Sequence, residues 1–328
     1  MSNYLEPIPL RRVRPHMPFC IVFNVASGSG DAEHRRQAMQ KILREADRKH
    51  EFFLVRDPRQ LKQIARRAAD RAVSNDGAVI VAGGDGTINA VAQATLPTGR
   101  PFGIIPQGTF NQTGRAHAIP LETSEATRTL LDARLEPLQV GLVNDRVFLV
   151  NASLGLYPQL LQDREAYKRQ FGRYRAVALL SALSTILRGS GKLILELEHD
   201  RERERVHTPS LFVGNNRLQL EQAGLPEASA IHDHKLAGVI VCASGPRALL
   251  SLMLQGALGK LGAANEVRSF PFHRMTVRPA MRGVSKVKVA LDGEIHWMKP
   301  PIVFSVAPQP LSLLVPMHPS SHEAQNSQ

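Results

Sequence analysis

The run Gly83-Gly84-Asp85-Gly86-Thr87 is the feature that most restricts how this chain can fold. It follows Ala78–Ala82, an apolar segment without alternation, which is typical of a strand buried on both faces of a parallel sheet. The residues after it, Ile88–Ala94, favour a helix. Glycines at such a junction let backbone N–H groups approach phosphate oxygens, and the helix N-terminus adds partial positive charge. The run therefore predicts a phosphate-binding loop. The alternative is a Gly/Asp turn that binds no ligand.

The first third of the chain alternates between apolar runs and polar amphipathic segments. The predicted strands are Phe19–Phe23, Phe52–Val55, Ala78–Ala82 and Phe102–Ile105. Helices are expected to begin after Asp31, a suitable N-cap, and at Asp57-Pro58, where proline occupies the first helical position. This order predicts a doubly wound α/β domain, with a parallel sheet and helices on both faces, over residues 17–137.

After residue 137 the pattern changes to strands joined by turns. Val140–Val150 is predicted to be a hairpin that turns at Asn144-Asp145. Further strands are expected at Lys192–Glu198, Val206–Val213, Gly238–Ala243, Val287–Leu291 and Ile302–Val306, with helices around Tyr157–Leu187 and Pro246–Leu261. Residues 138–316 are therefore predicted to form an antiparallel β-sandwich-like domain. Residues 1–16 and 317–328 are expected to be flexible termini.

Two more polar loops follow predicted strands of the first domain. Ser27-Gly-Ser-Gly30 comes after the first strand, and Gly108-Thr109-Phe110-Asn111 after the fourth. Because the carboxyl ends of strands in such sheets meet at one crevice, these loops and the Gly83–Thr87 run are expected to lie together. Asp85 supplies a carboxylate at the place where Mg²⁺ would bridge nucleotide phosphates.

The order of these motifs resembles the diacylglycerol kinase catalytic family, which includes bacterial lipid kinases and sphingosine kinases. The matching segments are Asn24-Val-Ala-Ser27-Gly28, Gly83–Thr87 with Asn89, Pro106–Asn111 with Ile119-Pro120, Asn151–Tyr157 with Arg164-Glu165, and Asp292-Gly293-Glu294 before Pro300-Pro301. The resemblance covers about residues 19–316. It implies an ATP-binding α/β domain paired with a β-rich lipid-acceptor domain, with ATP and lipid meeting between them.

The resemblance also implies roles for individual residues. The nucleotide contacts would be Asn24, Ser27, Gly28, Gly84, Asp85, Gly86, Thr87, Thr109 and Asn111. Asp85 would organise Mg²⁺ and ATP, and Glu294 would be the general base. A carboxylate suits that role because it can accept the proton of a lipid hydroxyl during phosphoryl transfer. A structural Mg²⁺ would be held by Asp233 and the carbonyls of Ala230 and Lys235.

Three positions depart from the family pattern. Asn111-Gln-Thr-Gly-Arg115 replaces an Asn-x-Phe-Ala-Arg run, Ala90 replaces a glutamate, and His234 replaces the glycine of the metal loop. His232 and His234 beside Asp233 also fit a transition-metal site or a solvated loop. The departures leave open a nucleotide-binding regulatory protein without turnover. A kinase of the NAD kinase type shares Gly-Gly-Asp-Gly-Thr, but the later motifs fit lipid kinases better.

The net charge and the two cysteines limit the kinds of partner and metal site that this chain is expected to have. Lys and Arg number 41 against 29 Asp and Glu, which gives +12 and an isoelectric point near 10.2, and this favours an anionic partner. No zinc-finger spacing or aromatic-interleaved basic motif points to nucleic acid. Cys20 and Cys242 lie in apolar runs and are expected to be buried thiols rather than zinc or redox ligands.

The expected location follows from hydropathy. No segment has the features of a signal peptide, and the longest apolar stretch, Val177–Leu187, is about half a membrane span. We therefore expect a cytoplasmic enzyme that acts on a diacylglycerol-like or sphingoid acceptor at an anionic membrane surface, peripheral to its inner face. The basic and then apolar segment Arg164–Leu187 is compatible with a surface-lying helix or with a core helix. A homodimer is compatible with the sequence.

Overall fold

The chain forms two compact units, Met1–Leu138 with Gln309–Gln328, and Gln139–Pro308. The computed structural model describes residues 12–28, 31–155, 193–200, 202–242, 245, 248–249, 251–252, 255, 259–280 and 283–317. The predicted helix at Tyr157–Leu187, the segment Arg164–Leu187 and most of both termini lie outside these residues, as does part of the predicted helix Pro246–Leu261. No helix within the described ranges is long and apolar enough to cross a membrane.

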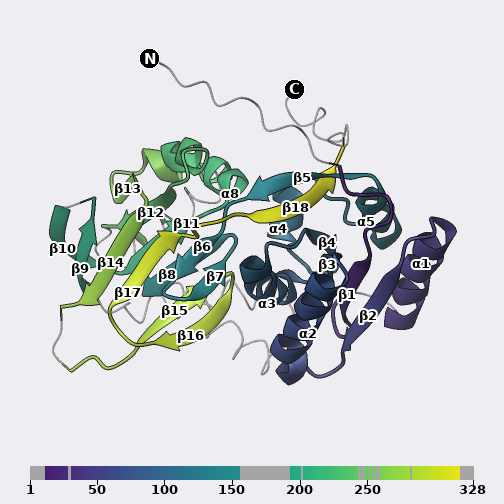
Figure 1. The fold of residues 1–328 in the computed structure, drawn as a ribbon. Helices are drawn as coiled ribbons and strands as arrows, with labels where there is room; N and C mark the ends of the chain where they lie inside the picture. Colours follow the sequence, from purple (N-terminus) through teal and green to yellow (C-terminus); the bar gives the residue numbers. More distant parts are fainter. Residues whose placement is uncertain are drawn as a thin grey trace, which may run out of the picture. The chain divides into compact units, whose positions relative to one another are not determined.

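The first unit is built on one six-stranded sheet in the order β2-β1-β3-β4-β18-β5 (Figure 1). The strands are β1 (Phe19–Asn24), β2 (His50–Val55), β3 (Ala78–Gly83), β4 (Phe102–Pro106), β5 (Ala133–Leu138) and β18 (Leu311–Pro316). Strands β1 to β4 are parallel, which confirms the four predicted strands of this region. The chain runs from β1 to β2 on one side and then to β3 on the other, so the strand order reverses between β1 and β3. Ligands of open α/β sheets bind at such a switch point.

Two helices of the first unit begin where the sequence predicted, after Asp31 and at Pro58, whereas α3 begins three residues before the predicted Ile88 and the remaining helices were not predicted. They are α1 (Ala32–Glu45), the short η1 (Pro58–Gln60), α2 (Leu61–Ser74), α3 (Asp85–Thr95), η2 (Leu96–Thr98), α4 (Gln112–Ala116) and α5 (Thr123–Leu131). The Asp31 carboxylate accepts the Glu33 N–H at 2.9 Å, and Asp57 accepts the Arg59 N–H at 3.0 Å, so both aspartates act as N-caps. Helix α2 packs against α3, and α1 packs against α5.

The last strand returns to the first sheet, which the sequence did not predict. We assigned residues 138–316 to one second domain, but β18 lies between β4 and β5. It pairs antiparallel with β5 from Leu311↔Leu138 to Pro316↔Ala133, and parallel with β4 at Leu313↔Phe102. Its apolar run is buried, as suits the interior of a sheet, yet such a run does not specify which sheet it joins.

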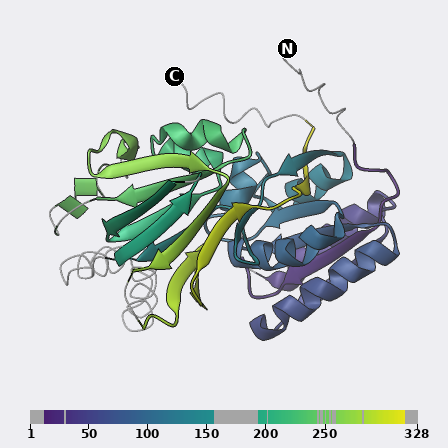
Figure 2. The ribbon, with the colours of Figure 1, turned by 60° about the vertical axis from the view of Figure 1, so that its left-hand side comes forward.

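The second unit contains two six-stranded antiparallel sheets. One has the order β10-β9-β14-β17-β6-β7 and the other β13-β12-β11-β8-β15-β16. The strands are β6 (Gly141–Val143), β7 (Arg146–Phe148), β8 (Asn151–Gly155), β9 (Leu193–His199), β10 (Glu202–Thr208), β11 (Ser210–Gly214), β12 (Leu236–Val241), β13 (Val267–Phe272), β14 (Arg274–Pro279), β15 (Val287–Leu291), β16 (Glu294–Met298) and β17 (Ile302–Val306). Three short helices, α8 (Arg217–Gln222), η3 (Pro226–Ile231) and η4 (Leu261–Ala263), accompany the second sheet (Figure 2).

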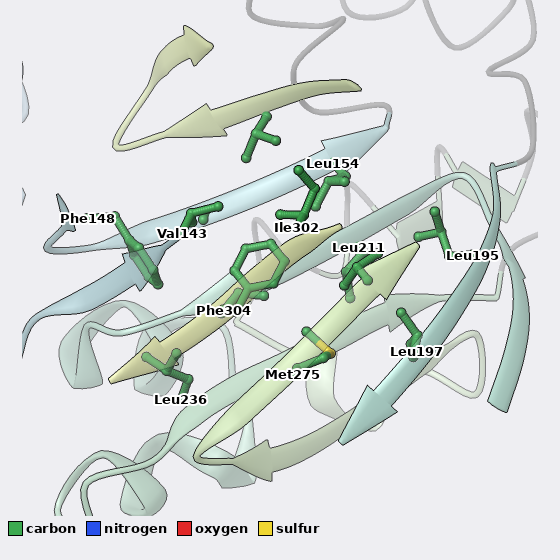
Figure 3. Close-up of a cluster of buried hydrophobic side chains, with 14 of the residues drawn as sticks. Val143, Phe148, Leu154, Leu195, Leu197, Leu211, Leu236, Met275, Ile302 and Phe304 are labelled. Atoms are coloured by element: carbon green, nitrogen blue, oxygen red, sulfur yellow. The ribbon is translucent and has the colours of Figure 1, made fainter. Parts of the chain in front are cut away.

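Both sheets contribute side chains to one hydrophobic core. Figure 3 shows Phe304 and Met275 from the first sheet beside Leu211 and Leu154 from the second. All four side chains are at most 2% exposed. The strands of the second unit are therefore held together by a shared inner layer, and on its other face the second sheet packs Ala237 and Val239 against α8 and η3.

Two details differ from the predictions for this unit. Val206–Val213 was predicted to be one strand, but the chain breaks at Pro209, and β10 and β11 belong to different sheets. Proline lacks the N–H that a continuous ladder needs, so it suits a corner between sheets. Cys20 is buried as predicted, and burial raises the pKa of its thiol, whereas Cys242 is exposed at the end of β12. The predicted hairpin at Asn144-Asp145 is confirmed as β6–β7.

Candidate active site

Three loops of the first unit meet at the carboxyl edge of adjacent strands. Strand β1 ends at Asn24, β3 at Gly83 and β4 at Pro106, and the register places Gly83 directly beside Pro106. Strands β1 and β3 are neighbours, with Phe23 beside Ala82. The structure thus brings together the three polar loops predicted from the sequence, at the point where the strand order reverses.

Asn24 ties the first of these loops to helix α3. Its side-chain Nδ2 donates to Thr87 Oγ1 at 2.8 Å, across the switch point between β1 and β3. Its Oδ1 accepts the backbone N–H of Ala26 at 3.1 Å. Thr87 is buried, so its hydroxyl is held by this contact inside the protein. Asn24 and Thr87, both predicted nucleotide contacts, therefore hold the junction between the first loop and α3.

Gly84 and Gly108 allow the second and third loops to touch. A Cβ added to Gly108 would lie 2.8 Å from the Cα of Gly84 and 2.9 Å from Asn111 Oδ1. These distances are shorter than normal van der Waals contacts, so neither loop could keep its place with a larger residue there. The two backbones approach closely because both residues lack a side chain.

Asn111 closes the third loop with both groups of its amide. Its Oδ1 accepts the Gly108 N–H at 2.7 Å, and its Nδ2 donates to the Gly108 carbonyl at 2.9 Å. Asn111 is buried and has φ +50, a conformation that asparagine tolerates better than most residues. By contrast, Thr109 and Phe110, inside the closed loop, are exposed. Of the predicted nucleotide contacts in this loop, Thr109 presents its side chain and Asn111 uses its own to hold the loop.

Helix α3 starts at this edge without a side-chain cap. Its N-cap is Gly84, and the first intrahelical bond runs from the Ile88 N–H to the Gly84 carbonyl at 2.9 Å. The first N–H groups of a helix have no intrahelical partners, and together with the helix dipole they attract anions. Asp85 is the first residue of α3, and its Oδ1 accepts the Gln112 N–H at 3.0 Å, which links the starts of α3 and α4.

Arg35 of α1 holds the Ser27–Gly28 loop, a residue that the sequence analysis missed. Its Nη2 donates to the Ser27 carbonyl at 2.5 Å. Gly28 has φ +87, and a Cβ at Gly28 would lie 3.1 Å from the Arg35 guanidinium carbon. Nearby, hydrogen bonds from Arg36 and Gln37 lower the pKa of Glu33 to about 2. The start of α1 thus places a guanidinium against a loop predicted to contact phosphate. The sequence signal that could have identified Arg35 is an arginine in the first turn of the helix after this loop.

Gln107 is a second residue that the sequence analysis missed. It follows β4 directly, and its backbone N–H donates to the Gly83 carbonyl at 2.9 Å. Its side chain is 6% exposed, yet neither Oε1 nor Nε2 has a hydrogen-bond partner among the described residues. Buried amides are nearly always paired, so this amide is a polar group held at the candidate site without a protein partner there.

The second unit carries the predicted base at the start of β16. Asp292 and Gly293 form the turn between β15 and β16, with φ +45 and +87, values typical of a tight two-residue hairpin turn. The Asp292 carboxylate accepts three backbone N–H groups, from Leu149 at 2.8 Å, Val150 at 2.9 Å and Asn151 at 3.0 Å. Glu294, by contrast, is 61% exposed and lies 4.0 Å from His296 Nε2. Asp292 therefore fixes the turn, and the turn presents the Glu294 carboxylate to its surroundings.

The predicted metal loop is closed by its own backbone. The Ala230 carbonyl accepts the N–H groups of Asp233 at 3.0 Å and Lys235 at 3.1 Å, which uses both of its lone pairs. The Lys235 carbonyl accepts Gln139 Nε2 at 3.0 Å. This arrangement does not favour a cation held by these carbonyls and Asp233. Where the structure describes the chain, no three His, Cys, Asp or Glu side chains could hold a metal ion, and His232 contacts Arg217 instead.

His234 occupies a backbone conformation that favours glycine. Its φ is +56, and the family resemblance places glycine at this position. We expect His234→Gly to raise the free energy of unfolding by up to about 1 kcal/mol, because relief of the left-handed strain exceeds the extra entropy of the unfolded chain. Urea denaturation would measure it, with Asp233→Gly as the matched control. A His234→Gly variant that is less stable than the wild type would contradict the prediction that His234 is strained.

The first unit is similar in sequence to known lipid kinases. Residues 18–143 match a family model described as the diacylglycerol kinase catalytic domain. A protein named "Probable lipid kinase YegS-like" from Serratia proteamaculans is 35% identical over 147 residues, which are 44% of this chain and 46% of that protein. A diacylglycerol kinase of Bacillus subtilis is 37% identical over 99 residues, which are 29% of this chain and 33% of the relative. In both cases the alignment spans less than half of the relative's own length.

A solved structure extends the likeness to the fold of nearly the whole chain. The crystal structure of a diacylglycerol kinase from Bacillus anthracis str. Sterne aligns with a TM-score of 0.67 and 17% identity. The alignment covers 91% of this chain and 96% of that one. At this identity the comparison shows the fold alone, including the β-rich second half that lies outside the family model. Residues 18–143 are therefore similar to the diacylglycerol kinase catalytic domain, and the fold of nearly the whole chain is similar to that of a diacylglycerol kinase.

Proposed function

We propose that this protein is an ATP-dependent lipid kinase, which transfers the γ-phosphoryl group of ATP to the hydroxyl of a diacylglycerol-like or sphingoid lipid. The observation that carries the proposal is the start of α3, which has no side-chain cap and lies among three loops at the switch point of the sheet. An anion bound there would meet backbone N–H groups and the helix dipole. The names of the relatives support a lipid kinase over a kinase of the NAD kinase type.

The residues present fit a nucleotide polyphosphate. The close approach of Gly84 and Gly108 leaves backbone rather than side chains at this edge, and the Ser27–Gly28 loop adds a second glycine turn, with the Arg35 guanidinium behind it. Gly84, Asp85, Gly86 and Thr87 would contact the phosphates. Bound ATP supplies the phosphoryl group and its Mg²⁺ neutralises charge, with Asp85 as the predicted protein ligand.

Glu294 is the proposed general base. The acceptor oxygen must lose its proton as it bonds to the γ-phosphorus and as the bond to the ADP oxygen breaks, and a carboxylate can accept that proton. Asp292 holds the turn from which Glu294 projects, and the 61% exposure of Glu294 leaves its carboxylate accessible to a substrate. We further propose that the enzyme works in the cytoplasm on lipid at the inner, anionic face of a membrane.

The test is transfer of labelled phosphate from ATP to extracted bacterial-type lipids. We expect Asp85→Asn and Glu294→Gln each to lower turnover by at least about 100-fold, the usual contribution of a metal-organising or general-base carboxylate. Glu294→Gln should keep ATP binding. Asp85→Asn retains an oxygen that can accept the Gln112 N–H. A loss of turnover in this variant would therefore reflect the missing charge rather than a displaced loop.

Matched controls are available in each unit. Asp70→Asn, on the exposed face of α2, and Glu202→Gln, on the exposed strand β10, make the same chemical changes away from the candidate site and should leave turnover unchanged. Full activity of Glu294→Gln would refute the assignment of the base. ATP binding without product on any lipid of a broad panel would instead favour a nucleotide-binding regulatory protein.

A further inference from the structure

The single tryptophan of the chain lies on the surface of the second unit. Trp297 is 61% exposed, and among the described residues of that unit it is the one large hydrophobic side chain exposed to this degree. It lies on β16, which is an edge strand that pairs with β15 alone. An exposed aromatic on an edge strand is an aggregation hazard that proteins normally avoid, so its presence points to an interaction.

Three lysines surround this tryptophan. Lys288 lies opposite Trp297 in the ladder, with its Nζ 5.1 Å from the ring centroid. Lys286 and Lys299 are the next residues beyond the last pair, Val287↔Met298, and both are exposed. Because side chains alternate along a strand, the pattern places them on the same face as Lys288 and Trp297. We call Trp297, Ile295, Lys286, Lys288 and Lys299 the Trp297 surface.

The Trp297 surface lies on the sheet face opposite the hydrophobic cluster of the second unit, and this face is open at Lys286, Trp297 and Lys299, whereas Lys288 and Ile295 are half-buried and Ala290 is buried. Val289, Leu291 and Met298 of this hairpin belong to the hydrophobic cluster of the second unit, and Val287 packs against it. Residues that alternate with these therefore point to the opposite side. The acidic residues of the hairpin, Asp292 and Glu294, lie at the turn, away from the end that carries the lysines. The hairpin thus has an acidic turn and a basic, aromatic end.

We propose that the Trp297 surface docks the protein on an anionic lipid bilayer. Tryptophan is enriched at membrane–water interfaces, where its ring lies among the headgroups, and lysines around it attract anionic lipids. A nucleic acid or an acidic protein would also attract lysines, but the half-buried Ile295 beside the exposed Trp297 adds aliphatic area that suits a bilayer interface better. The charge and the apolar area together therefore favour the membrane.

This inference rests on the proposed function and makes it more specific. Glu294 and Trp297 are three residues apart on the same strand, a separation of about 10 Å. The hydroxyl of a diacylglycerol-like lipid lies near the headgroup level of a bilayer. Because side chains alternate along β16, Glu294 projects from the face opposite Trp297, so a tryptophan anchored at that level would hold the Asp292-Gly293 turn that carries Glu294 at the membrane surface.

The tryptophan itself reports the test, because the chain contains no other. We expect its fluorescence emission to shift to shorter wavelength when wild-type protein is mixed with phosphatidylglycerol vesicles, and not with phosphatidylcholine vesicles. Vesicle co-sedimentation should show binding about 100-fold weaker for the triple variant K286Q/K288Q/K299Q, since each lysine near the surface strengthens binding about fivefold. Binding should also weaken as salt is raised.

A charge-matched control separates this surface from general basicity. The triple variant K62Q/R66Q/R67Q removes the same charge from exposed positions of α2 in the first unit and should bind vesicles like the wild type. Equal weakening of both triple variants, or an unchanged emission spectrum with anionic vesicles, would overturn the proposal. A spectral shift that follows protein concentration without lipid would also overturn it, because the surface would then join two copies of the chain.

The same variants distinguish this inference from the proposed kinase activity. The K286Q/K288Q/K299Q variant should phosphorylate a lipid acceptor dissolved in neutral detergent micelles at the wild-type rate and lose activity on phosphatidylglycerol vesicles. Wild-type turnover without vesicle docking would refute the Trp297 surface and leave the kinase intact. Docking without turnover in either format would refute the kinase and leave the surface.

Discussion

Asp292→Ala is expected to lower the free energy of unfolding of the second unit by about 3 to 5 kcal/mol. The Asp292 carboxylate accepts three backbone N–H groups between Leu149 and Asn151, and its own N–H donates to the Asn151 carbonyl at 2.9 Å. Hydrogen bonds to a charged group each contribute about 1.5 to 3 kcal/mol, and alanine would leave several N–H groups without partners. Urea denaturation monitored by circular dichroism would measure the loss.

Two further substitutions make this prediction specific. Asp292→Asn keeps an oxygen that can accept part of this set and should lose less stability than alanine. Glu294→Ala, two residues away, removes an exposed side chain whose recorded ion pair is 4.0 Å long, and it should leave stability within about 0.5 kcal/mol of the wild type. An Asp292→Ala variant that unfolds at the wild-type urea concentration would contradict the structural role.

The contrast between these two acidic residues affects how activity data should be interpreted. Both belong to the Asp292-Gly293-Glu294 run, in which the family resemblance assigned the base to Glu294 and gave Asp292 no contacts of its own. The structure shows one carboxylate used within the protein and one presented outside it. Loss of turnover in Asp292→Ala would therefore report a displaced turn, whereas loss in Glu294→Gln, with stability kept, would report chemistry at the carboxylate.

Local pattern was sufficient to predict the part of the fold that positions the candidate site. The four parallel strands, the N-caps at Asp31 and Asp57 and the meeting of three loops all follow from short segments of sequence. Each depends on an apolar run, a capping residue or a glycine turn within a few residues. Because these signals are local, they can be interpreted without knowledge of the rest of the fold.

The features that were missed depend on contacts between distant segments. The apolar run of β18 would suit a buried strand in either unit. Only its pairing with β4 and β5 assigns it to the first unit. Pro209 could have indicated the break between β10 and β11, because a proline within a predicted strand argues against continuity. For Arg35 the signal was an arginine in the first turn after the Ser27–Gly28 loop, whereas Gln107 has no sequence signature for its position, since a long polar side chain is usually solvated.

The final prediction concerns the contact between the two glycine loops, and it rests on the proposed function. Gly108→Ala is expected to weaken ATP binding by about 100-fold, measured by calorimetry or by displacement of a fluorescent nucleotide. The new methyl group would lie 2.8 Å from Gly84 Cα and 2.9 Å from Asn111 Oδ1, so it would push apart the loop and the helix start that are proposed to hold the phosphates. Misplacement by about 1 Å in such a site costs on the order of 100-fold.

Gly99→Ala is the matched control for this variant. Gly99 lies in the same unit, after η2, with φ +63 and nothing within 4 Å of an added Cβ, so alanine there costs backbone strain without a collision. Gly99→Ala should lose about 1 kcal/mol of stability and keep its affinity for ATP. If the two variants lost affinity equally, the effect would be general destabilisation. If Gly108→Ala alone lost it, the close approach of the two backbones, rather than any side chain in them, would be what forms the phosphate site.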